Sequence, residues 1–205
     1  MIETARLRLR PWQDRDLPAF AEMNADPRVR KFFPSLLTRE ESDASVARFQ
    51  EMYALDGYAF MATELRETSE FIGLIGIQRM NFLLPGLSVP AVEIGWRLNE
   101  KSWGKGLATE GARACLSLAF EKFHLPEVVA FTIPANLPSR RVMEKLGMIR
   151  NPDEDFDDPR IPAGHPFQRH VLYRIQKLAC GEQYLAMAFA QLTYRESLRD
   201  IEACL

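Results

Sequence analysis

The chain has 205 residues, of which 47% are hydrophobic and 26% charged, and its formal net charge at pH 7 is -2. This composition fits a globular domain with a sizeable core, and the balanced charge argues against a general nucleic-acid-binding protein. No apolar run reaches membrane-spanning length and the first residues do not resemble a signal peptide, so we expect a cytoplasmic protein with neither a membrane nor a nucleic-acid partner. The cysteines and histidines are not spaced as metal ligands, and we predict no metal site.

The N-terminal part of the chain predicts a strand, a long helix and a hairpin. Leucine and arginine alternate over residues 6–10, which predicts a strand with its leucines inward and its arginines on a solvated face. Thr38 with Glu41 three residues later is the pattern of a capping box and predicts the start of a helix. Residues 58–65 and 71–77 are rich in strand-forming side chains, and the polar break between them predicts a hairpin.

The next well-patterned stretch opens with VEIGWRL, residues 92–98. Its apolar side chains alternate with Glu93, Gly95 and Arg97, so these three residues share the other face of a predicted strand. Because glycine has no side chain, we expect the face beside the Glu93 carboxylate to be open at Gly95.

A glycine turn and an amphipathic helix follow this strand. Gly104 and Gly106 let a ligand approach the backbone closely, and the helix, expected to start at Ala108 or Thr109, presents unpaired N–H groups at its positive end. This unit predicts a phosphate site. It is not a nucleotide P-loop, which needs Ser or Thr after its lysine, nor a dinucleotide fingerprint, because the third glycine is replaced by Thr109.

The hexapeptide Lys101-Ser102-Trp103-Gly104-Lys105-Gly106 resembles the pyrophosphate loop of the GCN5-related N-acetyltransferase (GNAT) family, although that family has Arg or Gln where Lys101 stands. The segment from Asn136 to Ser139, with VMEKLGM after it, resembles the family's second cofactor segment. The strings TxRLxLRPW and EIGWxL resemble the branch that contains the ribosomal-protein N-terminal acetyltransferases.

The resemblance covers residues 1–177 and implies an α/β (α+β) fold of the GNAT type. Such a fold has a mixed, mostly antiparallel central sheet of about six or seven strands and about four flanking helices. The sheet would splay near Glu93 and Phe131, where acetyl-CoA binds. The residues that the resemblance assigns to acetyl-CoA are Ile94, Gly95, Trp96, Lys101, Gly104, Lys105, Gly106, Leu107, Ala108, Thr109, Asn136, Ser139 and Arg141.

Acetyl transfer to an amine needs a group that accepts a proton from the amine and one that gives a proton to the leaving thiolate. Glu93 is the candidate base, acting through water; the alternative is a structural carboxylate paired with Arg97. Many family members use a tyrosine as the acid where this chain has Met143, so Ser139 is the candidate here. Its alternative role is to cap its helix. Cys115 lies on the apolar stripe of its helix, so we expect direct attack without a covalent enzyme intermediate.

The predicted function is transfer of an acetyl group from acetyl-CoA to a primary amine, either a protein N-terminus or a small molecule. A homodimer is the assembly considered for this enzyme. The alternatives are the same fold with another acyl-CoA donor, and a non-catalytic acyl-CoA sensor or partner module. Acceptor specificity would lie in residues 32–37, 81–90 and 151–166, which carry the weakest patterns. Within residues 149–167 we expect an acidic, solvated loop rather than a calcium site.

Residues 178–205 are predicted to be a separate helical tail. The string FAQLTYRESLRDIEACL resembles the N-terminal segment of an insertion-sequence transposase. One hypothesis is a read-through fusion, in which a mobile element inserted at the gene's end and the reading frame continues into it. The alternative is an ordinary C-terminal helix that packs on the domain or on a second subunit.

Overall fold

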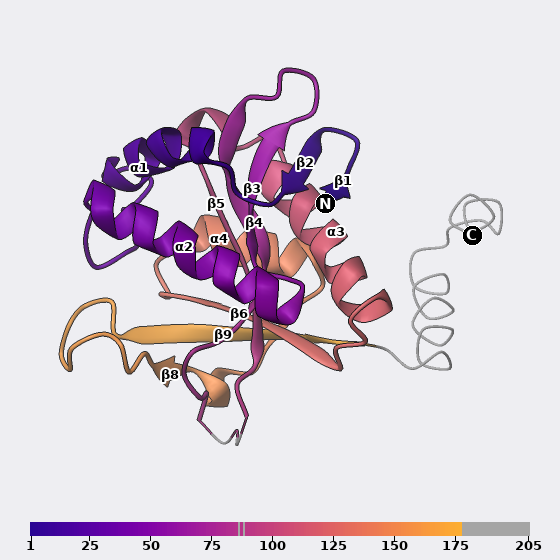
Figure 1. Cartoon of the computed structure of the whole chain (residues 1–205). Coiled ribbons are helices and arrows are strands. Elements are labelled where there is room, and N and C mark those ends of the chain that lie inside the picture. The colour runs from indigo at the N-terminus through magenta and orange to yellow at the C-terminus, as the bar shows by residue number, and fades with distance from the viewer. Residues whose placement is uncertain (86, 88, 178–205) are drawn as a thin grey trace. The chain divides into compact units, whose positions relative to one another are not determined.

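The computed structural model describes residues 1–85, 87 and 89–177 (Figure 1). The predicted tail, residues 178–205, therefore lies outside the described residues. The helices are α1 (Leu17–Ala25), α2 (Arg39–Asp56), α3 (Leu107–Glu121) and α4 (Leu137–Lys145), with 3-10 turns η1 (Asp14–Asp16), η2 (Glu100–Ser102) and η3 (Pro152–Glu154). Among the described residues, no helix is long and apolar enough to span a membrane.

A nine-stranded sheet in the order β1-β2-β3-β4-β5-β6-β9-β7, with β8 attached to β9, forms the centre of the domain. The strands are β1 (Ile2–Glu3), β2 (Leu7–Arg10), β3 (Phe60–Leu65), β4 (Phe71–Arg79), β5 (Val92–Leu98), β6 (Glu127–Thr132), β7 (Ile149–Arg150), β8 (Phe156–Asp157) and β9 (Arg169–Gln176). Neighbours from β1 to β5 are antiparallel, whereas β5 and β6 are parallel. The mixed, mostly antiparallel sheet is confirmed. The expected six or seven strands were too few, because β1, β7 and β8 have two residues each and show no alternation.

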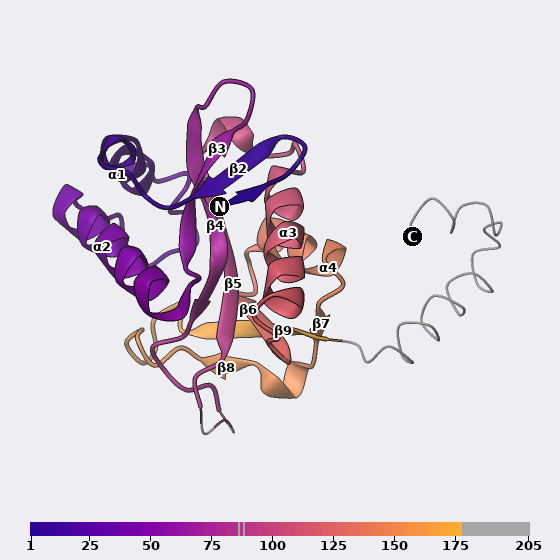
Figure 2. The ribbon, with the colours of Figure 1, turned by 45° about the vertical axis from the view of Figure 1, so that its right-hand side comes forward.

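The helices cover both faces of the sheet. Figure 2 shows α1 and α2 on one face and α3 and α4 on the other. The capping box at the start of α2 is confirmed, since Thr38 accepts from the Glu41 N–H and the Glu41 carboxylate accepts from the Thr38 N–H. Helix α3 begins at Leu107, slightly earlier than predicted, because Gly106 adopts a left-handed conformation and is the N-cap.

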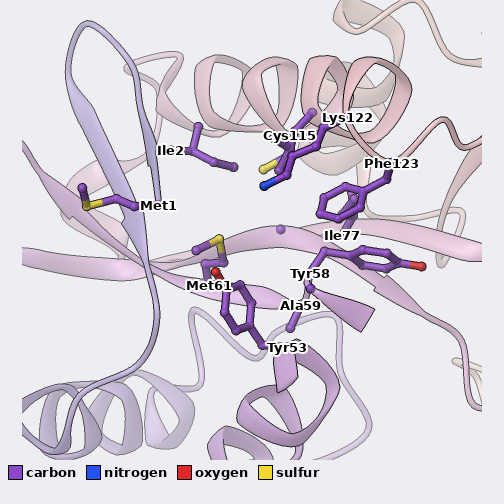
Figure 3. A pocket seen from close by; sticks show the side chains of 13 residues that line it. Met1, Ile2, Tyr53, Tyr58, Ala59, Met61, Ile77, Cys115, Lys122 and Phe123 are labelled. Atoms are coloured by element: carbon purple, nitrogen blue, oxygen red, sulfur yellow. The ribbon is translucent and has the colours of Figure 1, made fainter. Parts of the chain in front are cut away.

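Helix α3 packs tightly against the sheet. A Cβ on Gly111 would lie 2.5 Å from the end of the Ile75 side chain, so a larger residue would require Ile75 to shift. Cys115 is buried on this interface and borders a small cavity of about 40 Å³ with Tyr58 and Phe123 (Figure 3). Burial raises the pKa of the Cys115 thiol to about 12. A thiol in that state is a poor nucleophile, which supports the expected role as a core residue.

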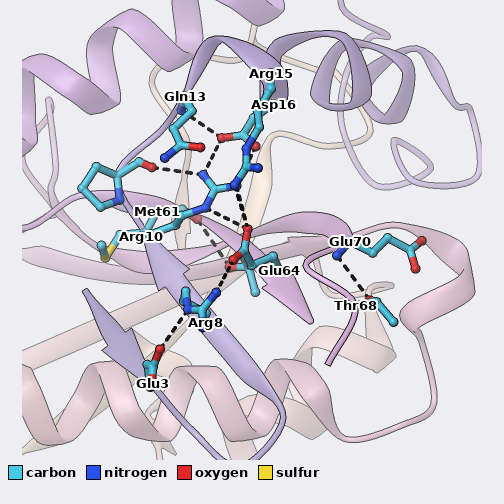
Figure 4. A network of polar contacts seen from close by, with 12 residues as sticks. Glu3, Arg8, Arg10, Gln13, Arg15, Asp16, Met61, Glu64, Thr68 and Glu70 are labelled. Carbon is cyan, nitrogen blue, oxygen red and sulfur yellow. Dashed lines mark hydrogen bonds and ion pairs between the residues drawn. The ribbon is translucent and has the colours of Figure 1, made fainter. Parts of the chain in front are cut away.

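The expectation of a solvated arginine face is wrong for Arg10, whereas Arg6 is exposed and Arg8 is half-buried. Leu7 and Leu9 point into the core as predicted, but Arg10 is also buried and bonds to Asp16 and Glu64 (Figure 4). The distances are 2.7 Å from Arg10 Nη1 to Asp16 Oδ2 and 2.8 Å from Arg10 Nε to Glu64 Oε2. Glu64 also pairs with Arg8 and Arg15, so each buried charge of this network has an opposite charge beside it, which is the condition under which buried charges are tolerated.

Candidate active site

A split between two parallel strands defines the candidate active site. Strand β4 pairs with β5 at every residue from Val92 to Leu98, whereas within the described strands β6 pairs with β5 only at Glu93, opposite Val129. Beyond Glu93, alternate backbone N–H and C=O groups on the free edge of β5 have no partner strand. The predicted splay near Glu93 is confirmed, and the free edge can hold an extended amide-containing ligand such as a pantetheine arm.

Glu93 lies where the two strands part. Its Oε1 accepts a hydrogen bond of 2.7 Å from Gln78 Nε2, because Gln78 is directly opposite on β4. Burial raises the pKa of Glu93, and the hydrogen bond from Gln78 and the charge of Arg160 oppose that rise. The alternative pairing of Glu93 with Arg97 is wrong, since Arg97 Nη1 donates to Asn24 Oδ1 instead.

Gly95 does not leave its face of β5 open. The ring of Phe60 lies across it, and a Cβ on Gly95 would come within 2.8 Å of that ring. Any larger residue here would therefore have to displace the Phe60 ring. The Phe60 ring forms an apolar surface between Glu93 and Arg97, which follow each other along the same strand face.

The acidic segment after α4 contributes to the site, and the prediction of a solvated loop is wrong for its centre. Phe156 and Asp158 are buried, with side chains facing the core rather than water. Arg160 Nη2 lies 2.6 Å from Asp158 Oδ2. Burial would raise the pKa of Asp158, but the hydrogen bonds and charge of Arg160 outweigh it and lower that pKa. This local ion pair allows an acidic residue to enter the core.

Aromatic rings join this segment to the loop after β4. Phe82 and Phe131 have ring centroids 6.0 Å apart, and the Arg160 guanidinium lies 4.5 Å from the Phe82 centroid. The His170 ring lies 5.6 Å from Phe131, and its burial lowers the pKa of the imidazole. Two of the segments expected to carry specificity, 81–90 and 151–166, thus meet beside Glu93 through this cluster.

The phosphate loop has the geometry of an anion site. Gly104 and Gly106 have φ of 73° and 76°, in the left-handed region that favours glycine, and a Cβ on Gly104 would meet no atom of the described residues within 4 Å. The N-cap of α3 carries no side-chain bond, and Glu110 donates the first helical hydrogen bond, to Gly106 O. The N–H groups of residues 107–109 therefore have no helical acceptor and are available to an anion.

Arg6 fixes this loop from the adjacent edge of the sheet. Its Nη1 donates 2.9 Å to Lys105 O, and its Nη2 lies 2.6 Å from Glu110 Oε2. Burial would raise the pKa of Glu110, but the hydrogen bonds from Thr4 and Arg6 outweigh it and lower that pKa. The sequence pattern did not indicate this role for Arg6, because the contact spans 99 residues of sequence.

The structure distinguishes among the residues predicted to bind the cofactor. Ile94 and Leu107 are buried, so only their backbone groups can face a ligand, while Trp96 packs on the same core. Lys105 is exposed on the loop. Lys101 is also exposed but lines a separate cavity of about 420 Å³ with residues of α1, so its part in phosphate binding stays a prediction.

The second arm of the site comes from β6 and α4. Asn136 caps α4, because its Oδ1 accepts from the Ser139 N–H, and its Nδ2 donates 2.9 Å to Thr132 Oγ1. The capping role considered for Ser139 thus belongs to Asn136. Within the described residues the Ser139 hydroxyl makes no hydrogen bond, so it is free to donate to a ligand. Arg141 is exposed, and Met143, at the family's tyrosine position, is buried.

These two arms fit acetyl-CoA. The uncapped start of α3 suits a pyrophosphate, and the free edge of β5 suits the amides of pantetheine. Residues that the sequence reasoning missed, Gln78, Asp158 and Arg160, act on Glu93 through a hydrogen bond or charge. The signal for Gln78 was available, because the predicted hairpin and strand place it one strand away on the same face.

A family model, a relative and a solved structure of acetyltransferases all match this chain. The family model of the acetyltransferase (GNAT) domain matches residues 6–149, and the model of a domain of unknown function, DUF4372, matches residues 167–205. An uncharacterized N-acetyltransferase, YnaD, from Bacillus subtilis is 31% identical over 175 residues, which cover 85% of this chain and 95% of that protein. A solved acetyltransferase from Agrobacterium tumefaciens has a TM-score of 0.69 and 30% identity, covering 86% of this chain and 94% of its own.

A third comparison supports the fold alone. The ribosomal L7/L12 alpha-N-protein acetyltransferase RimL, solved in complex with coenzyme A, has a TM-score of 0.67 at 14% identity, over 84% of this chain and 95% of that one. The matched model covers most of the chain, including the phosphate loop and the strand that carries Glu93. The chain belongs to the GNAT family of acetyltransferases and is an N-acetyltransferase that uses acetyl-CoA.

Proposed function

We propose that this enzyme acetylates the amine of a small molecule or peptide N-terminus in the β5–β6 split, with Glu93 as the base. The observation that supports this most is the position of Glu93 at the point where the strands part. Its raised pKa makes its carboxylate a stronger base than an exposed one. Glu93 accepts a proton from the amine through a water molecule while the amine nitrogen bonds to the carbonyl carbon.

The remaining steps use groups on the two arms of the site. Backbone N–H groups on the free edge of β5, near Gly95 and Trp96, stabilise the negative charge that develops on the carbonyl oxygen. As the carbon–sulfur bond breaks, the Ser139 hydroxyl passes its proton to the thiolate and recovers one from a solvent water, so that no serine alkoxide accumulates. A free thiol has a pKa of about 8.5, so a weak acid is sufficient. Ser139→Ala is expected to slow release of the thiol, with Ser117→Ala on α3 as the control.

The experiment that tests the proposal is a thiol-release screen with acetyl-CoA. Purified full-length protein is assayed with N-terminal peptides, amino acids, polyamines and aminoglycosides. Turnover on peptides alone supports a protein N-terminal acceptor, and turnover on small amines supports a metabolite or drug as the acceptor. Tight acetyl-CoA binding without turnover on any amine contradicts the proposal and favours the sensor.

Two further measurements test the acyl donor and the oligomeric state. Replacing acetyl-CoA by succinyl-CoA in the same assay tests the alternative acyl donor, and faster turnover with succinyl-CoA would contradict the choice of donor. Light scattering of the eluting protein tests the homodimer, which stays a prediction.

A further inference from the structure

Two arginines on the α1–α2 face of the sheet have no carboxylate partner in the part of the chain that the structure describes. Arg97 extends from β5 and Arg30 from the segment between α1 and α2, and their guanidinium carbons lie 4.3 Å and 4.4 Å from the centroid of the Phe33 ring. One aromatic ring therefore contacts two like charges. Phe33 belongs to residues 32–37, the third segment expected to carry acceptor specificity.

The hydrogen bonds of these arginines are made to neutral groups. Arg97 Nη1 donates 2.7 Å to Asn24 Oδ1, and Arg30 Nε donates 2.8 Å to Ser35 O. Arg97 Nε is buried without an acceptor. Within the described residues neither guanidinium forms an ion pair, although most of the other arginines do. An unpaired buried charge is costly unless something else compensates it.

The pKa values of Arg97 and Arg30 also differ in direction from that of Arg10, which has carboxylate partners. Burial and the neighbouring charge of Arg30 lower the pKa of Arg97 to about 9. Burial also lowers the pKa of Arg30, against the opposing charge of Glu41. By contrast, the hydrogen bond from Arg10 to Asp16 helps to raise the pKa of Arg10 despite its burial. An anion between Arg30 and Arg97 would supply the negative charge that these two guanidinium groups lack.

Arg97 lies on the same face of β5 as Glu93, the proposed base. Glu93, Gly95 and Arg97 share one face of β5, and Glu93 and Arg97, which are four residues apart, are separated by about 13 Å along the strand. The Phe60 ring over Gly95 is the apolar surface between them. The start of α3, where the cofactor phosphates are expected, belongs to the opposite face of the sheet (Figure 2). The anion that this pair suits is therefore not on the cofactor.

We propose that Arg97 and Arg30 bind a carboxylate of the acceptor, so that the enzyme prefers amines that carry a carboxylate several bonds from the nitrogen. The planar guanidinium matches a carboxylate in a two-point contact. Two guanidinium groups flanking Phe33 form a narrow anion-binding subsite. The alkyl part of the acceptor would lie on Phe60. This inference rests on the proposed acceptor site at Glu93.

The test compares acceptors that differ only in the carboxylate. The series from 4-aminobutyrate to 6-aminohexanoate is assayed against the alkylamine of the same chain length, with acetyl-CoA and the full-length chain. For at least one length, we expect kcat/KM for the amino acid to exceed that for the alkylamine by about 10- to 100-fold, mainly through KM. Equal values at every length would overturn the inference and leave the proposed function intact.

The variants separate recognition from folding. Arg97→Lys keeps a charge and a donor near Asn24, and Arg30→Gln keeps a donor near Ser35, so both are expected to fold, as checked by Tm. Each should reduce the preference for the amino acid at least about fivefold while kcat/KM for the alkylamine changes less than about twofold. Arg39→Gln, an exposed member of an ion pair with Asp43, is the control and should leave the preference unchanged. A preference that persists in both variants would contradict the inference.

A binding measurement separates this inference from the proposed function. Hexanoate carries the carboxylate without an amine, and its binding by calorimetry needs no turnover. If no amine is acetylated but hexanoate binds wild type and not Arg97→Lys, the proposed function fails and the anion-binding subsite is supported. If hexanoate does not bind wild type and the amino acids have no advantage, the subsite is wrong.

Discussion

Gln78 Nε2 donates a 2.7 Å hydrogen bond to Glu93 Oε1 across the β4–β5 pair, directly beside the point where β5 and β6 separate. This bond orients a partly buried carboxylate toward the split. Because burial raises the pKa of Glu93 despite that bond, the position is adapted to proton transfer at a cost in stability.

Replacing Glu93 by glutamine should stabilise the protein at alkaline pH. The pKa of Glu93 is higher in the folded state than the unfolded value of about 4.3, so its favourable contribution is present below that value and lost as the pH rises through the folded pKa. Glutamine keeps an oxygen for Gln78 without the charge. We expect a higher Tm than wild type at about pH 8 and a difference that shrinks toward pH 4, measured by calorimetry. A lower Tm at pH 8 would contradict this account.

Gly104→Ala should weaken coenzyme A binding beyond its effect on stability. Gly104 and Gly147 have φ of 73° and 78°, and a Cβ at either would meet nothing within 4 Å. Alanine at either position should cost about 1–2 kcal/mol in backbone strain. Only Gly104→Ala places a methyl group in the phosphate loop, so we expect the Kd of coenzyme A by calorimetry to rise at least about fivefold. An equal Kd for both variants would argue against the phosphate site.

Arg10→Met should destabilise the domain strongly. The substitution leaves the buried carboxylate of Asp16 without its cation, while Glu64 keeps Arg8, and breaking such a buried pair costs about 3–5 kcal/mol. Arg39→Met, at an exposed ion pair, is the control and should change the free energy of unfolding by less than about 0.5 kcal/mol. Urea denaturation measures both, and a loss below about 1 kcal/mol for Arg10→Met would show that the network is not structural.

Ending the chain after Lys177 should leave the enzyme intact. Residues 1–175 form one compact unit, and the last strand, β9, ends at Gln176. If residues 178–205 are a read-through fusion, the truncated protein should have the same Tm and the same thiol-release rate as the full chain. An insoluble or unfolded truncated protein would instead support a C-terminal helix that packs on the domain or on a second subunit.

Much of the fold was predictable because its signals are local. The alternation of Leu7 and Leu9, the capping box at Thr38 and the apolar stripe of α3 each arise within one element. The short strands β1, β7 and β8 were not predictable, since two residues carry no period. Arg10 was assigned to the wrong environment because its partners, Asp16 and Glu64, include one that is 54 residues away.

The candidate site was predictable where a motif fixes the backbone and unpredictable where side chains meet across the fold. The left-handed Gly104 and Gly106 follow from the loop pattern, and Glu93 follows from strand alternation. The burial of Asp158 does not, because an acidic segment normally favours solvent and here depends on Arg160 and nearby aromatic rings. The Phe60 ring over Gly95 likewise depends on the register of β3 and β5 across β4.

The role of Glu93 is tested most directly by the pH dependence of kcat/KM for wild type and Glu93→Gln with one amine and acetyl-CoA. We expect wild-type kcat/KM to rise with pH through the raised pKa of Glu93, and the variant to be slower by about 10²- to 10⁴-fold without that limb. The limb due to the amine itself is common to both proteins, and Glu67→Gln, at an exposed position, is the control. A variant with the wild-type rate and the wild-type pH profile would contradict the assignment of Glu93 as the base.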